Sequence, residues 1–271
     1  MRRQGLTWFI DIVLLAGVLA VQAEPQTDTA GEDFRRGVRL QQAGRYAEAA
    51  AAYEMALHGV ERSLGPAHIS AARILVNIGT VYALQHDDLE AKAAFERALR
   101  IMEQALGPRH VQVGFTLTTL ALLAHKQGWY GAAEPLYVRA LRILEDTLGP
   151  EHERTALLET AMAKLYLVQR RNTEAEGLLE RAIPILEKSG KSDEFRLVVA
   201  LNDLAEAYRR DGRYSKAEPL YARIWATAGA DPSVLNGEVR AGLYDYVQML
   251  RKTKRKTEAR ELETQLGTIL P

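Results

Sequence analysis

Three histidines recur at one spacing and are the side chains of this sequence best placed to do chemistry. His68, His110 and His152 are separated by a constant offset, and each follows a Leu-Gly-Pro tripeptide after one intervening residue. Clustered histidines can bind zinc or act as a base. Zinc ligands converge within about 4 Å, whereas equivalent residues in stacked two-helix units lie about 16–20 Å apart. We therefore interpret each histidine as a residue that begins the following helix at a tight loop.

Four glutamates share this spacing and would, if they converged, form the paired carboxylates of a general acid and base. The same separation keeps them apart, so we interpret them as solvated residues near helix ends that pair with a column of arginines. The sequence also contains no cysteine, no glycine-rich phosphate loop, no Gly-x-Ser-x-Gly and no His-Glu-x-x-His motif. We therefore expect no enzymatic activity, no cofactor and no metal ion. The glutamates are Glu61, Glu103, Glu145 and Glu187, and the arginines are Arg97, Arg139, Arg181 and Arg223.

Charge is balanced over the whole chain, with 35 Lys plus Arg against 35 Asp plus Glu. A nucleic-acid-binding protein usually carries a basic excess, so we expect no nucleic-acid partner. One basic run interrupts the balance, Arg251-Lys252-Thr253-Lys254-Arg255-Lys256. It has two interpretations, a solvated turn between helices or a docking patch for an acidic partner.

The start of the chain, residues 1–23, has the three parts of a secretory signal peptide in order. Arg2 and Arg3 are followed by an apolar stretch from Trp8 to Val21, and Val21-Gln22-Ala23 offers cleavage after Ala23. The alternative is an uncleaved anchor, although the stretch is shorter than the about 20 residues of a bilayer span. We expect export to a bacterial periplasm or secretion, with no integral membrane span after cleavage. Residues 24–30 are polar and are interpreted as a linker.

A single repeat organises the rest of the chain. The tripeptide Leu64-Gly65-Pro66 returns as Leu106-Gly107-Pro108 and as Leu148-Gly149-Pro150, and apolar residues within each unit recur with the period of an α-helix. Glycines divide each unit into two helices, neither of which can bury its apolar face alone, so stacking into a solenoid is expected. The units span about residues 31–67, 68–109, 110–151, 152–193, 194–232 and 233–271. One alanine column runs through all of them: Ala49, Ala91, Ala133, Ala175, Ala217 and Ala259.

Two further columns explain how each helical hairpin closes. Small residues occupy one column, so two backbones can approach, and aromatic side chains fill the neighbouring space. The small residues are Gly79, Ala121, Ala163 and Ala205, and the aromatic residues are Tyr53, Phe95, Tyr137 and Tyr221.

These residues resemble a known family. Ile78-Gly79-x-x-Tyr82, then Ala91-x-x-x-Phe95-x-x-Ala98 and Pro108, are similar to the signature of the tetratricopeptide repeat (TPR), in the 42-residue form of kinesin light chains. The resemblance covers about residues 31 to 271 and implies an all-α, right-handed solenoid of about six hairpins. It also implies a non-catalytic protein that binds a protein or peptide ligand.

The resemblance further implies that the first helix of each hairpin lines a concave groove. The residues expected there are those turned away from the small-residue column. Several are apolar, which indicates either hydrophobic anchors for a peptide or burial against the neighbouring unit. The predicted partner-binding residues are Arg73, Asn77, Thr80, Leu84, Phe115, Thr119, Leu122, Lys126, Leu157, Lys164, Val168, Asp203, Glu206 and Arg210.

Two hypotheses for function follow. The first is an exported scaffold or adaptor that binds a protein or peptide partner in this groove. The second is a homo-oligomeric structural protein of the cell envelope, in which solenoids assemble through their ends because the last unit is a weak cap.

Overall fold

The computed structural model describes residues 28–188, 194–230 and 235–269, and within these ranges all regular structure is α-helical. The predicted signal peptide of residues 1–23, with its cleavage site at Ala23, lies outside the described residues. No helix in the described part of the chain is both long and apolar enough to cross a membrane. The helices are α2 (Asp28–Gln42), α3 (Tyr46–Leu64), α4 (Ile69–Gln85), α5 (Asp88–Leu106), α6 (Val111–Lys126), α7 (Tyr130–Leu148), α8 (Glu153–Val168), α9 (Asn172–Lys188), α10 (Glu194–Arg210), α11 (Tyr214–Ala230), α12 (Gly237–Lys252) and α13 (Lys256–Ile269).

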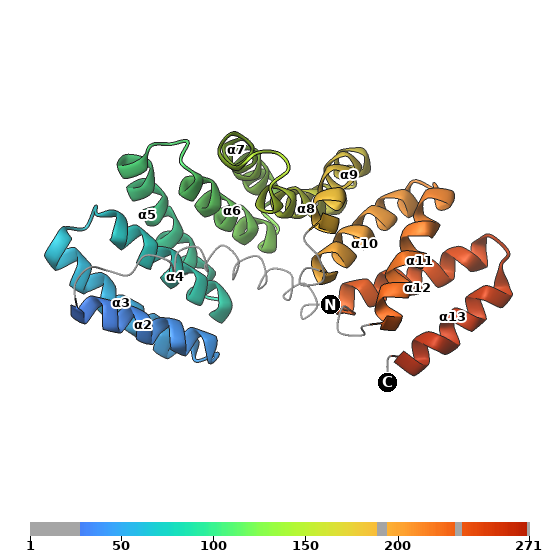
Figure 1. Cartoon of the computed structure of the whole chain (residues 1–271), viewed down its shortest axis with the longest axis horizontal. Helices are drawn as coiled ribbons and strands as arrows, with labels where there is room; N and C mark the ends of the chain where they lie inside the picture. The colour runs from blue at the N-terminus through green and yellow to red at the C-terminus, as the bar shows by residue number, and fades with distance from the viewer. Residues whose placement is uncertain (1–27, 189–193, 231–234, 270–271) are drawn as a thin grey trace. The chain divides into compact units, whose positions relative to one another are not determined.

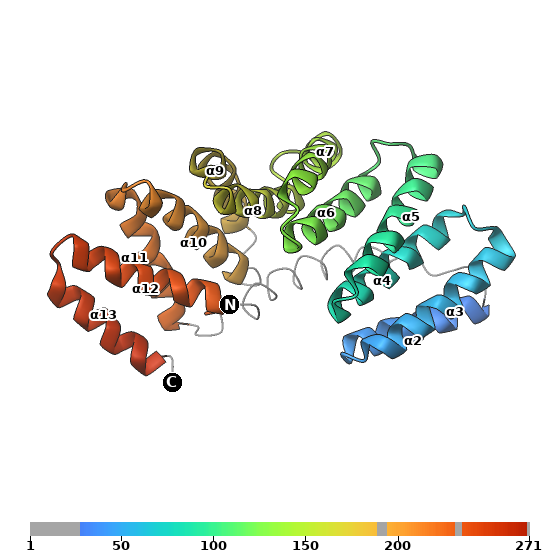
Figure 2. The ribbon, with the colours of Figure 1, turned by 180° about the vertical axis from the view of Figure 1, so that it is seen from behind.

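Successive helices pair as hairpins, which confirms the fold class predicted from the sequence. Each predicted 42-residue repeat contains one helical hairpin, from α2 with α3 to α12 with α13, as Figures 1 and 2 show. The linker prediction needs one correction, because the first helix already begins at Asp28, inside the proposed linker of residues 24–30. The polar pair Asp28-Thr29 is typical of a helix N-terminus as well as of a loop, and here it starts the helix.

The described helices form two compact units, with the boundary between Gly149 and Pro150. The first unit, residues 28–149, consists of the hairpins α2/α3, α4/α5 and α6/α7. The second unit, from Pro150 to the end of α13, consists of α8/α9, α10/α11 and α12/α13.

Local chemistry sets where the helices begin. The Nδ1 atoms of His68, His110 and His152 each accept a hydrogen bond from the backbone N–H two residues on, at 3.2, 3.2 and 3.0 Å. A side chain that accepts at this place satisfies one of the N–H groups left free at a helix start. The histidines are therefore N-caps, as their spacing predicted.

A second column sets where the first helix of each hairpin ends. Gly44, Gly128 and Gly212 have φ values of 73°, 79° and 71°, in the left-handed region that glycine enters without steric cost. The equivalent positions in the other hairpins also have positive φ, although they carry side chains. The turn geometry is thus kept in every hairpin, whichever residue stands there. The non-glycine members of this column are His86, Arg170 and Lys254.

In the hairpins α2/α3 and α4/α5, the core is built on the contact between a small residue of the first helix, Gly37 or Gly79, and an aromatic residue of the second. A Cβ atom added to Gly79 would lie 2.7 Å from Cε1 of Phe95, and one added to Gly37 would lie 2.6 Å from Tyr53. Phe95 and Tyr53 are fully buried, as are Tyr137 and Tyr221. The two columns therefore fix how closely the two helices approach, as the sequence predicted.

Ion pairs join consecutive second helices on the outside of each unit. Arg97 bonds Glu61 at 2.5 Å, Arg139 bonds Glu103 at 2.6 Å, and Arg223 bonds Glu187 at 2.5 Å. These three pairs confirm the predicted pairing of the two columns. Arg181 departs from the pattern, because it pairs with the buried Glu159 on α8. In the first three pairs both side chains are at least partly exposed, so each of them contributes little to stability.

Two helix-interior glycines give a test of this packing. Gly79→Ala should lower the free energy of unfolding by about 1–3 kcal/mol, because the new methyl group would overlap the buried ring of Phe95. Gly177→Ala is the matched variant, since nothing lies within 4 Å of its added Cβ. It should raise the free energy of unfolding by about 0.5–1 kcal/mol through helix propensity. Urea unfolding of both variants measures the difference, and a stabilising Gly79→Ala would contradict the proposed close contact.

Candidate partner-binding face

Half of the predicted groove residues lie in the core. Leu122, Asn77 and Thr80 are fully buried, and four others expose less than a tenth of their surface. A buried side chain offers no surface to a partner, so for these positions the burial alternative holds and a contact role does not. The seven are Asn77, Thr80, Thr119, Leu122, Leu157, Lys164 and Asp203.

The other predicted residues reach the surface, and we call them the accessible set. Val168, at the last position of α8, is 52% exposed and is one of the large apolar side chains most open to solvent. Leu84 and Phe115 are partly exposed apolar residues of the first unit. Apolar side chains that alternate with charged ones on one face suit the recognition of a peptide. The accessible set consists of Arg73, Leu84, Phe115 and Lys126 in the first unit, and Val168, Glu206 and Arg210 in the second.

Threonines can occupy the buried positions because their hydroxyl groups bond within their own helix. Thr80 donates to the carbonyl of Val76 at 2.8 Å, and Thr160 donates to that of Ala156 at 3.0 Å. Thr119 donates to the carbonyl of Thr116 at 2.8 Å. Such local bonds satisfy the hydroxyl without a partner from another helix. These threonine hydroxyls are therefore already satisfied within the chain.

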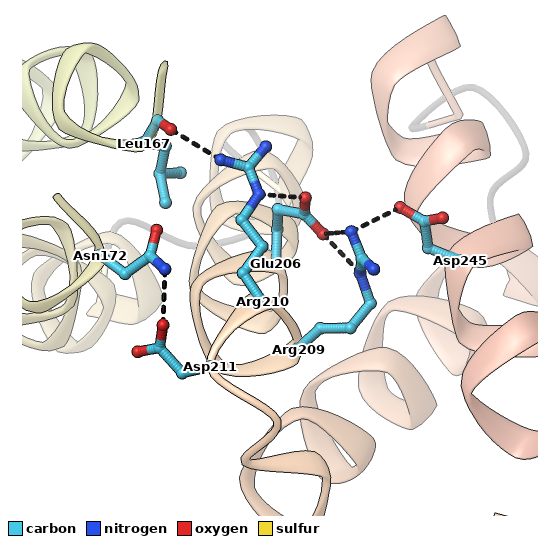
Figure 3. A network of polar contacts seen from close by, with 7 residues as sticks. All are labelled: Leu167, Asn172, Glu206, Arg209, Arg210, Asp211 and Asp245. Carbon is cyan, nitrogen blue, oxygen red and sulfur yellow. Dashed lines mark hydrogen bonds and ion pairs between the residues drawn. The ribbon is translucent and has the colours of Figure 1, made fainter. Parts of the chain in front are cut away.

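Two cations of the accessible set hold the end of the preceding first helix. Lys126 Nζ donates to the carbonyl of Ala83 at 3.3 Å and to Asp88 Oδ1 at 2.8 Å. Arg210 donates to the carbonyl of Leu167 at 2.6 Å (Figure 3). Both cations face the negative end of a helix, where the last carbonyl groups lack intrahelical partners. The same register, 43 residues back along the chain, is used in both units.

Arg210 belongs to a wider network of charges on α10 and α12 (Figure 3). Glu206 accepts from Arg210 at 2.5 Å and from Arg209 at 2.6 Å. Arg209 also pairs with Asp245 on α12, at 3.2 Å. Burial raises the pKa of Asp245 even though Arg209 opposes the shift. This network ties the first helices of three hairpins together through α8, α10 and α12.

A second, deeper cluster joins the same three helices. Lys164 Nζ on α8 lies 3.2 Å from Asp203 Oδ1 on α10 and 2.5 Å from Glu238 Oε1 on α12. Burial lowers the pKa of Lys164, but the two carboxylates outweigh burial and hold this pKa above its ordinary value. Burial raises the pKa of Asp203 to about 7, because the attraction of Lys164 does not offset it. Asp203 Oδ2 accepts no hydrogen bond from the described residues.

Glu238 was missed by reasoning from the sequence. The ion pair it makes with Lys164 spans 74 residues and skips one hairpin, so neither helical periodicity nor the repeat offset indicates it. Lys164 and Asp203 carried a weaker signal, because they stand with opposite charges in the predicted partner-binding set, on the first helices of consecutive hairpins. Within the described ranges, no three His, Cys, Asp or Glu side chains gather closely enough to hold a metal ion.

Comparisons with known proteins agree with this geometry. The tetratricopeptide repeat family matches residues 35–104, 70–146, 112–188 and 154–228. A search of curated protein sequences gives no significant match.

Several solved structures share the fold at low sequence identity. The putative kinesin light chain repeats of Podosopora anserina are 23% identical with a TM-score of 0.62, covering 74% of this chain and 95% of that one. BtubC (BKLC) from P. vanneervenii is 19% identical with a TM-score of 0.66, covering 80% and 91%. A Rap protein complexed with competence and sporulation factor is 16% identical with a TM-score of 0.59, covering 89% and 74%.

The buried cluster predicts a pH dependence of stability. In the unfolded chain an aspartate has a pKa of about 3.9, so between about pH 4 and pH 7 the folded state keeps a proton on Asp203 that the unfolded state has lost. This contribution to stability is present below about pH 4 and declines as the pH rises toward 7. Asp203→Asn removes it. The stability of this variant relative to the wild type should rise by about 1–3 kcal/mol between about pH 4.5 and 7.5.

Urea unfolding of the two proteins at several pH values provides the measurement. The exposed Asp146 supplies the matched variant, Asp146→Asn, whose stability should parallel that of the wild type. Parallel curves for Asp203→Asn and the wild type would show that Asp203 is not protonated in the folded chain at these pH values.

Proposed function

Because the chain belongs to the tetratricopeptide repeat family, we propose that it is an exported, non-catalytic scaffold that binds a protein or a peptide segment through the first helices of its hairpins. The observation that carries this proposal is the accessible set. It places the apolar residues Leu84, Phe115 and Val168 at the surface beside charged ones. Apolar anchors flanked by polar contacts are the usual means by which a helical face holds an extended or helical peptide.

The charges around these anchors are already organised. Lys126 and Arg210 are fixed by carbonyl groups and by Asp88 and Glu206, so a ligand would not have to order them. Preorganised polar groups lower the entropic cost of binding. The Rap protein complexed with competence and sporulation factor supports the proposal, since it is a protein of similar fold that holds a factor.

Leu84 and Val168 give the direct test, one in each unit. Leu84→Asp and Val168→Asp should each reduce capture of a partner from an envelope extract by about tenfold, because an exposed anchor is replaced by a charge. The measurement is quantitative mass spectrometry of proteins held by the immobilised mature chain, followed by titration of the captured protein. Both side chains are partly exposed, so folding should be retained and is checked by circular dichroism.

Met55→Asp is the matched control, because Met55 is a comparably exposed apolar residue on the second helix α3. Capture should be unchanged in this variant. If it falls as much as in Leu84→Asp, or if neither anchor variant loses the partner, the first helices are not the binding face.

Export rests on residues 1–23, with Arg2 and Arg3 before the apolar stretch and Ala23 at the small-residue motif. Expression in a bacterial host should place the protein in the periplasmic fraction, and N-terminal sequencing should begin at Glu24-Pro25. A chain that remains with membranes and keeps residues 1–23 would instead be anchored there. This outcome would leave the binding proposal unchanged.

A further inference from the structure

The first helix of the last hairpin exposes a face that is covered in the other hairpins. Tyr244 on α12 is 51% exposed, whereas the equivalent residues Asn202 and Thr160 are 5% and 6% exposed. The reason is visible at Asn202, whose Oδ1 atom lies 1.8 Å from the place where a Cβ of Gly242 would stand. The next first helix, α12, thus packs directly on Asn202. Within the described chain no helix follows α12 and α13 to cover Tyr244 in the same way.

The exposed face of α12 has a definite chemistry. Its six exposed residues carry three cations, one aromatic ring and no carboxylate. Arg240 donates to the carbonyl of Leu235 at 3.1 Å, and Arg251 bonds Glu263 on α13 at 2.6 and 2.7 Å. A guanidinium group has five N–H donors, so both arginines keep donors for a further acceptor. The face, which we call the α12 face, consists of Arg240, Ala241, Tyr244, Gln248, Arg251 and Lys252.

The contact between the first helices α10 and α12 shows which charged group a helix that covers α12 must supply. Where α12 covers α10, Asp245 pairs with Arg209. Arg251 occupies on α12 the position that Arg209 has on α10, one repeat earlier. A helix that covers α12 in the same register would therefore place its counterpart of Asp245 opposite Arg251.

A second copy of this chain is a poor occupant of the face. In its first helix α2, Arg35 stands at the repeat position that Asp245 has in α12. If α2 of one copy packed head-to-tail on α12 of another, Arg35 would therefore lie opposite Arg251. A second contact gives the same result. Within the chain, Arg255 pairs with Glu218. In the head-to-tail contact the equivalent positions hold Arg45 of one copy and Arg260 of the other. Like charges at both places oppose end-to-end assembly, although opposite charges stabilise the internal joints.

We propose that the α12 face is a docking surface for an acidic amphipathic helix of another protein, which packs on Tyr244 and presents a carboxylate to Arg251. The inference rests on the proposed function and names the chemistry of one partner segment. Tyr244 supplies the rigid aromatic area of an interface anchor. Arg240 and Lys252, like Arg251, favour negative charge on the partner.

The test uses the full mature chain and a labelled peptide constrained as a helix. The probe has the sequence of Gly237–Lys252 with Arg240→Gln, Arg251→Gln and Lys252→Gln, which leaves Glu238 and Asp245 as its charges. The control peptide carries Glu238→Gln and Asp245→Asn in addition. Fluorescence anisotropy should show saturable binding of the probe, with a Kd about tenfold lower than that of the control peptide.

Two variants of the chain locate the site of binding. Tyr244→Ala and Arg251→Gln should each weaken binding of the probe by about tenfold, whereas Trp129→Ala, which removes an exposed aromatic ring of the first unit, should leave it unchanged. Both changed side chains are exposed, so the fold should persist. Equal binding of the two peptides, or equal loss in Trp129→Ala, would overturn the proposal.

Sedimentation of the unliganded chain tests the competing occupant. The wild type should be monomeric at all concentrations. The double variant Arg35→Asp with Arg45→Glu should associate, because its first hairpin then complements the α12 end. Adding Arg251→Gln to this double variant should weaken the association. Association of the wild type that Tyr244→Ala abolishes would assign the face to a second copy and overturn the proposal. If the probe fails while Leu84→Asp still loses a captured partner, this inference is wrong and the proposed function stands.

Discussion

The contact between a small residue on the first helix and an aromatic ring on the second is the constraint on which the rest of the structure depends. Gly79 and Gly37 leave no room for a Cβ beside Phe95 and Tyr53, so the distance between the two helices of a hairpin is fixed. Once that distance is set, consecutive hairpins of a unit stack in one register. The ion pairs of Arg97 with Glu61 and of Arg139 with Glu103 recur at the same offset because of it.

Close stacking also decides the fate of polar groups on the first helices. Little space remains between neighbouring first helices, so a side chain there must find a partner inside the protein. Threonines bond their own helix, Lys126 and Arg210 bond the end of the preceding helix, and Lys164 bonds carboxylates from two hairpins. Charge on this face therefore serves first to join hairpins, and the part left for a partner is smaller than its sequence indicates.

What could be predicted from the sequence follows the range of each interaction. The histidine N-caps and the glycine turns depend on residues close in the chain, so spacing alone identified them. The hairpins recur once in every repeat and their small and aromatic columns in most of them, so comparing the repeats with one another identifies them. The burial of Leu122 and the bond between Lys164 and Glu238 depend on how neighbouring hairpins stack, which no single repeat encodes. For that reason the predicted groove contained both accessible and buried residues.

The first and last hairpins of the described chain differ chemically from the hairpins between them. Arg209 meets Asp245 and Arg255 meets Glu218 at internal joints, so opposite charges stabilise the stack where hairpins belong together. At the ends the same columns carry arginine on both sides, with Arg35 and Arg45 near the start and Arg251 and Arg260 near the finish. A repeat that continued its internal pattern would polymerise, because each end would complement the other. A chain with zero net charge thus carries like charges at these places, and the acidic helix that we propose would complement the α12 face.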